Sequence, residues 1–579
     1  DMVVHEPSGK EMARVARVSA NINLVSLLCG LIDIGTAQLF GIKATLYKDT
    51  PNSAPNYQFL IDALSSEDND EPSKVNLHLG TLIMRHANVR YDVKSLPTKL
   101  NQIDANHIHL SNCGMNLNIA CLQNDTISIA VKRLRATEET SKLKINDLQL
   151  KLNAGKSKAL LSDFSMETLH SELKIDTLML LYPTFSKDSA FVINSSEMEG
   201  KISFNEFGHL MPKFASMSGT ALFSLSVNGD DNTVEINHLR IATDNDGLTL
   251  GSDIKIEHPL KNKKRRIIAD IKQLDVDKSI MKQVASMMEW KKDSLIDNID
   301  HVNYKGKWDI SAEGKRMVSS GSVMSGAGNA EYEVTLNEEK WLKAKLYGDS
   351  ITIGTIIGDS LIGIASFEAD AMINTSATKP LPEGSISCKV DNIIFNGCNY
   401  SNIELNARSD SKHAHASLAI DDDNAKAAAD LAYSDTGEKS VKLSMLMERL
   451  NMSRLNIISS PHIDDLSLKL NADIAGADFK RMYGHVNIDD ISMSVDSSLC
   501  HIGNLHVLAE RIDSRLSRYT IKSDMLKAKV EGEVAMADIA ASMTNQLAKH
   551  LPILFRHSEA NADAVFTYSA TVSDAPALH

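Results

Sequence analysis

Apolar and polar residues alternate along most of this chain, which is the period expected of β-strands with one buried face. The alternation is interrupted repeatedly in the same way. Two alternating apolar positions are followed by two other residues and then by a second apolar pair. The copies are Ile32, Ile34, Ala37 and Leu39; Leu77, Leu79, Leu82 and Met84; Ile103, Ala105, Ile108 and Leu110; Leu143, Ile145, Leu148 and Leu150; Leu173, Ile175, Leu178 and Leu180; Val234, Ile236, Leu239 and Ile241; Met445, Met447, Leu450 and Met452; Cys500, Ile502, Leu505 and Val507.

In a regular strand, the odd spacing between the two pairs would place them on opposite faces of the sheet. Both pairs share one face only if the strand has a bulge or a corner between them. The intervening residues, such as Asn146-Asp147 and Asn237-His238, are types that tolerate turn geometry. The sequence therefore predicts a mainly β fold, an elongated curved sheet resembling a trough with an apolar inner face. Unrelated strands of a β-sandwich with coincidental bulges are the alternative.

Three segments have the spacing of short amphipathic helices instead, and they lie near residues 55–65, from Asp277 toward Ile299, and from Met536 toward Leu551. Asp277 is the expected N-cap of the second helix. The predicted organisation is a bent-strand region over 1–272, a helix or linker over 273–301, a second curved sheet over 302–535, and a further helix and strand over 536–579.

Composition narrows the possible functions. The chain has 579 residues, with 61 Lys and Arg against 75 Asp and Glu, for a net charge of −14. This is the wrong sign for a protein that neutralises nucleic-acid phosphates. The six cysteines form no CxxC pair, although Cys388 and Cys398 flank a predicted hairpin and are candidates for a disulfide. No catalytic residues, metal ligands or cofactor are predicted. We expect a soluble chain, because no apolar stretch is long enough for a membrane helix. We also expect the chain to be a segment of a longer protein.

Two polar clusters have alternative interpretations. His107 and His109 share a strand face, where they would be either two metal ligands or solvated side chains. Lys261, Lys263, Lys264, Arg265 and Arg266 form the strongest local charge cluster. This cluster would contact lipid phosphates or simply form a solvated loop.

Several segments resemble the AsmA-like part of TamB proteins. They are Ser19–Leu24, Ile34–Gly41, Asn56–Phe59, Ile83–His86, Tyr91–Asp92, Leu122–Leu134, His170–Leu173 with Tyr182, Val302–Gly306, Gly314–Gly328 and Phe395–Ile403. The similarity extends from about residue 18 to the end, and it consists of strand patterns and not of catalytic signatures. The resemblance implies a periplasmic translocation and assembly protein, anchored in the inner membrane by a segment outside this chain and reaching toward the outer membrane. It also implies the curved sheet of bridge-like lipid transfer proteins.

A groove for acyl chains needs a continuous apolar lining, since each methylene removed from water contributes about 0.8 kcal/mol. The motif positions provide such a lining, and the 23 methionines are suited to an adaptable surface. The predicted partner is a phospholipid or another acyl-chain lipid. The candidate groove residues are Leu77, Leu79, Leu82, Ile108, Leu110, Leu143, Ile145, Leu148, Leu150, Leu173, Ile175, Leu178, Leu180, Val234, Ile236, Leu239, Ile241, Leu450, Ile502, Leu505 and Val507.

Two other functions stay open. One is a scaffold for the assembly of outer-membrane β-barrel proteins, which would pair its exposed strand edges with client strands and bind a barrel-assembly partner. The other is a β-helix enzyme or adhesin that acts on polysaccharide. An enzyme of that kind needs clustered carboxylates near aromatic side chains. No such cluster surrounds Trp290, Trp308 or Trp341, the tryptophans of this sequence, which favours the lipid-binding interpretation.

Overall fold

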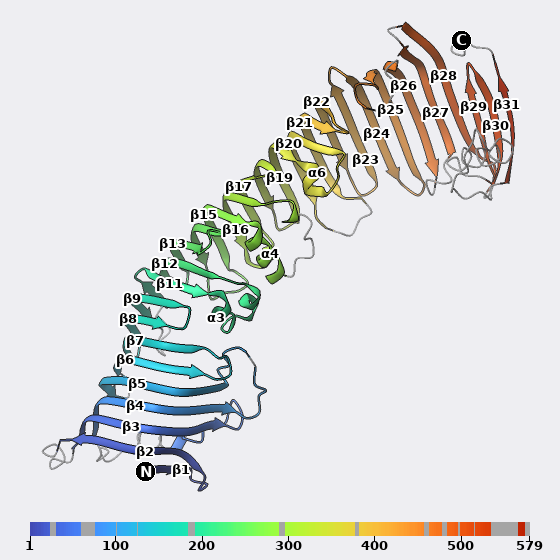
Figure 1. The fold of residues 1–579 in the computed structure, drawn as a ribbon. Coiled ribbons are helices and arrows are strands. Elements are labelled where there is room, and N and C mark those ends of the chain that lie inside the picture. Colours follow the sequence, from blue (N-terminus) through green and yellow to red (C-terminus); the bar gives the residue numbers. More distant parts are fainter. Residues whose placement is uncertain are drawn as a thin grey trace, which may run out of the picture. The chain divides into compact units, whose positions relative to one another are not determined.

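The protein is mainly β, as predicted, and its described residues form 31 strands and a few short helices in a computed structural model (Figure 1). The described residues are 1–23, 31–59, 76–99, 101–123, 126–182, 191–288, 296–376, 381–456, 463–476, 483–495, 498–513, 516–533 and 565–573. Two compact units divide the chain between Glu313 and Gly314.

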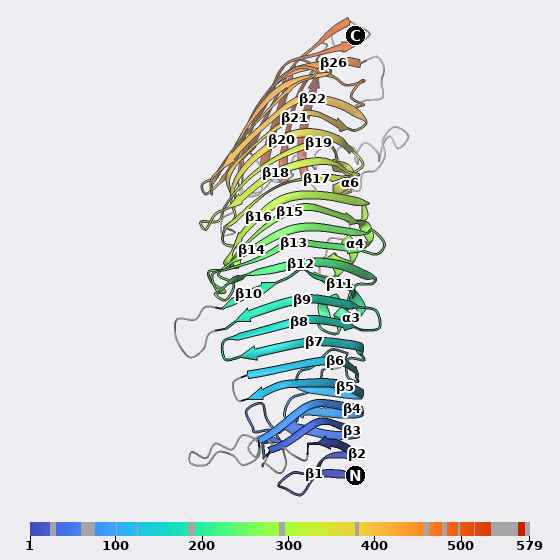
Figure 2. The ribbon, with the colours of Figure 1, turned by 90° about the vertical axis from the view of Figure 1, so that its left-hand side faces the viewer.

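The first unit is a curved sheet of successive strands with helices at one side (Figure 2). Its elements are β1 (Met2–His5), β2 (Glu11–Ile22), β3 (Leu31–Lys48), β4 (Asn76–Val93), β5 (His107–Gln123), β6 (Thr126–Glu138), β7 (Lys144–Gly155), β8 (Lys158–Glu167), β9 (Glu172–Leu181), β10 (Val192–Ser195), β11 (Met198–Ser203), α3 (Phe204–Gly208), η1 (Pro212–Ser216), β12 (Thr220–Asp230), β13 (Thr233–Thr243), β14 (Leu248–Glu257), β15 (Arg266–Asp277), α4 (Lys278–Met287) and β16 (His301–Ser311).

Neighbouring strands of this unit pair antiparallel, with one exception. β3 and β4 are parallel, with Ile34 beside Leu79 and Ala44 beside Val89. β10 and β11 form one interrupted strand, since both of them pair with β9 on one side and with β12 on the other.

The second unit is a curved sheet in which each strand pairs antiparallel with the next one. Its elements are β17 (Met317–Ser325), β18 (Gly328–Leu336), β19 (Trp341–Thr352), α6 (Ile353–Ile357), β20 (Ile362–Asn374), β21 (Glu383–Phe395), β22 (Cys398–Ser409), β23 (His413–Asp421), β24 (Ala425–Asp435), β25 (Lys439–Asn451), β26 (Ile463–Gly476), β27 (Tyr483–Val495), β28 (Ser498–Arg511), β29 (Ser517–Ser523), β30 (Leu526–Glu533) and β31 (Val565–Val572). The turn η2 (Ala312–Gly314) lies at the boundary between the units.

Bulges occur where several copies of the motif predict them. In β13, Ile236 pairs with Ile254 and Leu239 pairs with Ser252, so that two residues oppose one on β14. One of the two, His238, has a positive φ of 53°. Equivalent register shifts lie within the copies on β7, β25 and β28. Positive φ is rare for residues with a side chain, and Asn, Asp and His adopt it more readily than most, which explains the residue types found between the apolar pairs.

The copy around Ile103 is different, and its prediction as a bent strand is wrong. Ile103 and Ala105 lie before β5, in the connection from β4, and Asp104 forms an isolated bridge with His107. The register of β5 shifts further along, next to Asn112, whose φ is 51°. A turn and a bulge both place Asn or His between apolar residues, so the spacing alone does not distinguish them.

The core of the first unit lies along the bends. Val15, Ile42, Ala87, Cys113 and Ala136 come from successive strands and form one buried cluster, in which Ala87 is 0% exposed. We call the face of each unit that carries these apolar positions its inner face.

The helices contribute a second cluster. Asp277 caps α4 as predicted, because its Oδ1 accepts a hydrogen bond of 2.8 Å from the backbone N–H of Ile280. Val284 and Met287 of α4 pack with Phe204 and Met217 from the region of α3 and η1. Of the helix predicted near residues 55–65, only the part up to Phe59 is described, and the one predicted from Met536 to Leu551 lies outside the described residues.

Candidate functional site

The inner face of the second unit carries an unbroken row of uncharged apolar residues, one from each strand between β18 and β31. Each member pairs with the next across the sheet, and backbone pairing places paired residues on the same face. The row consists of Val334, Ala344, Ala371, Ile386, Ala407, Ala416, Leu431, Leu443, Ala472, Val486, Val507, Ile521, Ala528 and Ala570.

A second inner row runs beside the first one and contains Tyr332, Leu346, Ala369, Cys388, Leu405, Leu418, Ala429, Met445, Leu470, Ile488, Leu505 and Ser523. A third row lies between the two inner rows. Its side chains point to the opposite side of the sheet, which we call the outer face. It consists of Glu333, Lys345, Asp370, Ser387, Asn406, Ser417, Asp430, Ser444, Asn471, Asn487, His506, Lys522, Lys527 and Thr571, all of them polar.

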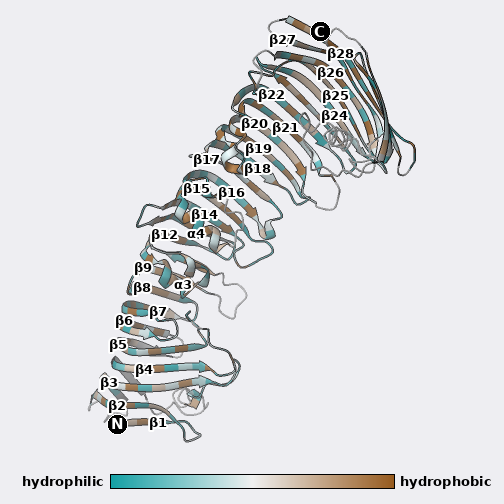
Figure 3. Cartoon of the chain, turned by 45° about the vertical axis from the view of Figure 1, so that its right-hand side comes forward, coloured by the Kyte–Doolittle hydropathy of each residue, from teal (hydrophilic) through white to brown (hydrophobic). Residues whose placement is uncertain are grey.

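The first unit has a matching inner row made mostly of larger side chains. It consists of Val18, Leu39, Met84, Met115, Leu134, Leu148, Met166, Leu173, Gly200, Phe223, Ile241, Leu250, Leu274 and Tyr304. On the outer face, a polar row crosses β7 to β15 through Gln149, Ser165, Lys174, Glu199, Ser224, Arg240, Gly251 and Gln273. Figure 3 shows hydrophobic and hydrophilic residues in bands along the strands.

The inner face of the second unit is partly exposed. Ile386 is 41% exposed and Leu405 is 38% exposed, although both belong to the inner rows. Among the described residues, no second layer of strands covers this face. An apolar surface of this extent is unusual for an exposed face and indicates a binding surface.

An apolar hollow lies on this open face between β20 and β23. Its volume is about 230 Å³, and its lining includes Ile373, Ile386, Ala407 and Ala416, with Leu381 beside them. Alanine side chains leave space that leucine or methionine would fill. The hollow is smaller than the roughly 300–1,000 Å³ typical of drug-sized ligands, and it is suited to one slender apolar chain.

Four of the predicted groove residues share one face of β13. Val234, Ile236, Leu239 and Ile241 pair with residues that alternate regularly on β14, so all four share one face. The remaining positions whose side chains are described are at least partly buried on their strands or beside them: Leu82, Ile108, Leu110, Leu143, Ile145, Leu148, Leu150, Leu173, Ile175, Leu178, Leu180, Leu450, Ile502, Leu505 and Val507. The side chains of Leu77 and Leu79 lie outside the described residues.

The apolar motif does not predict the alanine-rich inner rows. It consists mainly of large aliphatic residues, whereas β18 to β24 have alanine at many inner positions. On β24, Lys426 and Asp430 alternate with Ala427 and Ala429, but Ala428 stands between them on the outer side. Period-two alternation with charged neighbours is the signal that identifies this strand, and alanine weakens it because it occurs on both faces.

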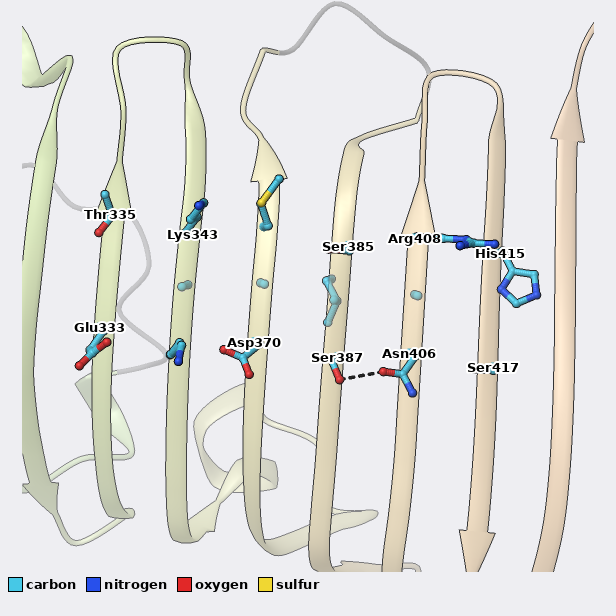
Figure 4. Close-up of a pocket in the computed structure, with 16 residues that line it drawn as sticks. Glu333, Thr335, Lys343, Asp370, Ser385, Ser387, Asn406, Arg408, His415 and Ser417 are labelled. Atoms are coloured by element: carbon cyan, nitrogen blue, oxygen red, sulfur yellow. Dashed lines mark hydrogen bonds between the residues drawn. The ribbon is translucent and has the colours of Figure 1, made fainter.

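The outer face of the second unit has a shallow polar depression of about 720 Å³ (Figure 4). Glu333, Lys345 and Asp370 stand side by side there on successive strands. The hydroxyl of Ser387 donates a hydrogen bond of 2.7 Å to the Asn406 side chain. Most of the side chains that line this depression are polar and belong to the outer face, and Ala344, Ala371, Ile386 and Ala407 of the inner row also border it.

His107 and His109 both contact one carboxylate oxygen of Asp92, at 2.9 Å from His107 Nδ1 and from His109 Nε2. His107 is buried, so the interpretation of this residue as a solvated side chain is wrong. Burial raises the pKa of Asp92, but hydrogen bonds from the two histidines and Arg90 outweigh this and lower it to about 2. Within the described part of the chain, no group of three His, Cys, Asp or Glu side chains is arranged to hold a metal ion.

The chain was compared with protein-family models, curated proteins and solved structures. No protein-family model, curated protein or solved structure matches this chain. The described part of the chain contains no helix that is long and apolar enough to cross a bilayer. Cys388 and Cys398 are free thiols.

Proposed function

We propose that this protein holds the acyl chains of phospholipids, or of similar lipids, against the inner faces of its two units. The observation that supports this most strongly is the uninterrupted row of uncharged residues on every strand from β18 to β31, with an all-polar row beside it on the other face. In this proposal the chain is no enzyme. It is part of a periplasmic lipid-transport bridge between the inner and outer membranes, as the TamB-like strand patterns suggest.

The physical basis is the match between the lining and an alkyl chain. Each methylene that leaves water contributes about 0.8 kcal/mol, and it does so at any point along a uniform apolar face. A single carboxylate on that face would have to lose its hydration when a chain covers it, which is strongly unfavourable. The absence of charge from both inner rows of the second unit therefore allows a chain to slide and not only to bind.

Native mass spectrometry of the purified chain, followed by lipid extraction, tests this function. We expect co-purified phospholipid, and we expect Leu148→Asp and Leu443→Asp to lower the amount bound by at least about tenfold. The matched controls are Gln149→Asp and Ser444→Asp, which place the same charge on the neighbouring outer position. These controls should bind as much lipid as the unmodified chain.

Two results would contradict the proposal. One is a folded, lipid-free protein that transfers no fluorescent phospholipid between vesicles. The other is an equal loss of lipid in the inner-face and outer-face variants, which would mean that added charge and not the apolar row controls binding. Circular dichroism of all four variants separates loss of lipid from loss of fold.

A scaffold for barrel assembly is a second candidate, favoured by the strands at the ends of the chain. Among the described residues, β1 pairs only with β2, and β31 pairs only with β30. The second backbone edge of each strand is unpaired by described residues, and an edge of this kind is able to pair with a client strand. Crosslinking from cysteines placed at Ser569 and Thr571 to a client strand would support this role, and crosslinking no greater than that from Ser444→Cys would contradict it.

A further inference from the structure

The hairpin that joins β14 to β15 ends in an ordered basic tip, residues 258–265, beside the charged Arg266. The backbone N–H of Lys261 donates to the His258 carbonyl at 3.0 Å, and that of Lys264 donates to the Lys261 carbonyl at 2.8 Å. These bonds close two consecutive turns. The tip is therefore a structured projection from the sheet and not an extended loop.

Arg265 of the tip and the neighbouring Arg266 form hydrogen bonds within the protein. Arg265 Nη2 donates to the carbonyl of Pro259 at 2.9 Å. Arg266 forms a bidentate pair with Asp309, in which both distances are 2.6 Å. Arg266 is therefore not free to form a bidentate contact with a soluble phosphate group, which is the interaction for which arginine is best suited.

The three lysines have the opposite environment. Lys261, Lys263 and Lys264 are exposed, and within the described part of the chain their side chains form no ion pair or hydrogen bond. Directly before them, Leu260 is 69% exposed, and only a few large apolar residues in the described chain are as exposed. An apolar side chain next to several unpaired cations has the chemistry of an interfacial membrane contact.

We propose that this tip docks on the surface of a bilayer rich in anionic phospholipid, with Leu260 in the interface and the lysines facing the phosphates. Each lysine close to an anionic surface contributes roughly a fivefold increase in binding. The chain as a whole carries a net charge of −14. Because charges are screened beyond about 8 Å at physiological ionic strength, the tip can be attracted while the rest of the surface contributes little.

Sedimentation of the full chain with lipid vesicles tests this docking. We expect binding to vesicles of phosphatidylglycerol and phosphatidylcholine, little binding to phosphatidylcholine alone, and release at 0.5 M salt. The variant K261E/K263E/K264E should bind at least about tenfold more weakly, and Leu260→Ser should bind severalfold more weakly. The control K201E/K305E/K307E changes the net charge equally at exposed lysines elsewhere in the first unit, and it should bind within about twofold of the unmodified chain.

Several outcomes would overturn the proposal. Equal binding to neutral vesicles, or an equal loss in both triple variants, would exclude a specific role of the tip. Competition by inorganic phosphate at constant ionic strength would indicate a free-phosphate site instead. Lipid bound on the inner face, measured by native mass spectrometry, should be the same in K261E/K263E/K264E as in the unmodified chain, so failure of docking is distinguishable from failure of the acyl-chain proposal.

Discussion

The inner faces of the two units have the same pattern but different side-chain volumes. In the first unit the row through Leu39, Met84 and Leu134 is bulky, and its side chains pack on the buried cluster at the bends. In the second unit the row through Ala344, Ala371 and Ala407 is small and partly open to solvent. Alternation alone makes a face apolar, whereas the volume of the residues decides whether the face fills itself or leaves room for a ligand.

Overpacking should affect the two units very differently, and this is the largest effect we expect. Ala87→Phe places a ring at a position that is 0% exposed, and it should lower the free energy of unfolding by about 3 kcal/mol. Ala371→Phe, on the open row, should change it by less than about 1 kcal/mol. The midpoints of urea unfolding measure the change in stability of both variants. A similar loss in both variants would mean that the second inner face is packed as tightly as the first.

The hollow of the second unit should be sensitive to filling. Ala407→Phe places a ring where the proposed acyl chain lies, and we expect lipid recovered from the chain to fall severalfold. Asn406→Phe is the matched control, because Asn406 is the neighbouring residue on the outer face. Quantitative lipid extraction of both variants measures the effect, and equal recovery from both would exclude the hollow as a binding position.

The two units should also differ in their response to acid. The pKa of Asp92 falls from 3.8 to about 2, so a proton binds the unfolded chain first as the pH drops. The stability from this carboxylate is complete above about pH 4 and is lost as the pH falls toward 2. We expect this carboxylate to contribute about 1–2 kcal/mol to the free energy of unfolding, after allowance for solvent screening. Urea unfolding between pH 5 and pH 2 should show this loss of stability, and the loss should be absent from Asp92→Asn.

Asp410 in the second unit is the comparison for this pH dependence. Backbone N–H groups of Lys412 and His413 hold its pKa at about 2 as well. Its side chain is largely exposed, so solvent screens the interaction and Asp410→Asn should have a smaller effect than Asp92→Asn. An effect at Asp410 as large as at Asp92 would mean that burial does not matter to this coupling.

The smallest effect concerns the helix of the first unit. Asp277→Ala removes the side-chain cap of α4 and should lower the free energy of unfolding by about 1 kcal/mol. Ser279→Ala, two residues further along and exposed, should change it by less than about 0.5 kcal/mol. Thermal unfolding of the two variants measures the difference, and equal stabilities would show that the cap contributes nothing.

The sequence predicts much of the apolar lining, because alternation is a local property. It also identifies the bends around Asn146 and His238, since an odd spacing between apolar pairs requires a bulge. The sequence does not distinguish those bends from the turn at Asp104, because the apolar pairs on either side of that turn have the same spacing. The burial of His107 could not be predicted either, because its partner Asp92 comes from another strand and the side chain reaches a carbonyl in the β4–β5 connection.

The local pattern of apolar and polar residues is enough to predict long strands with one apolar side and frequent bends. How these strands align follows from the folded chain alone, because register depends on pairing between residues far apart in the sequence. The parallel arrangement of β3 and β4, the continuous rows on the inner faces and the hollow above Ala407 all depend on that alignment. An alanine is an ordinary small residue in one strand, and it becomes part of a groove only when its neighbours across the sheet are small as well.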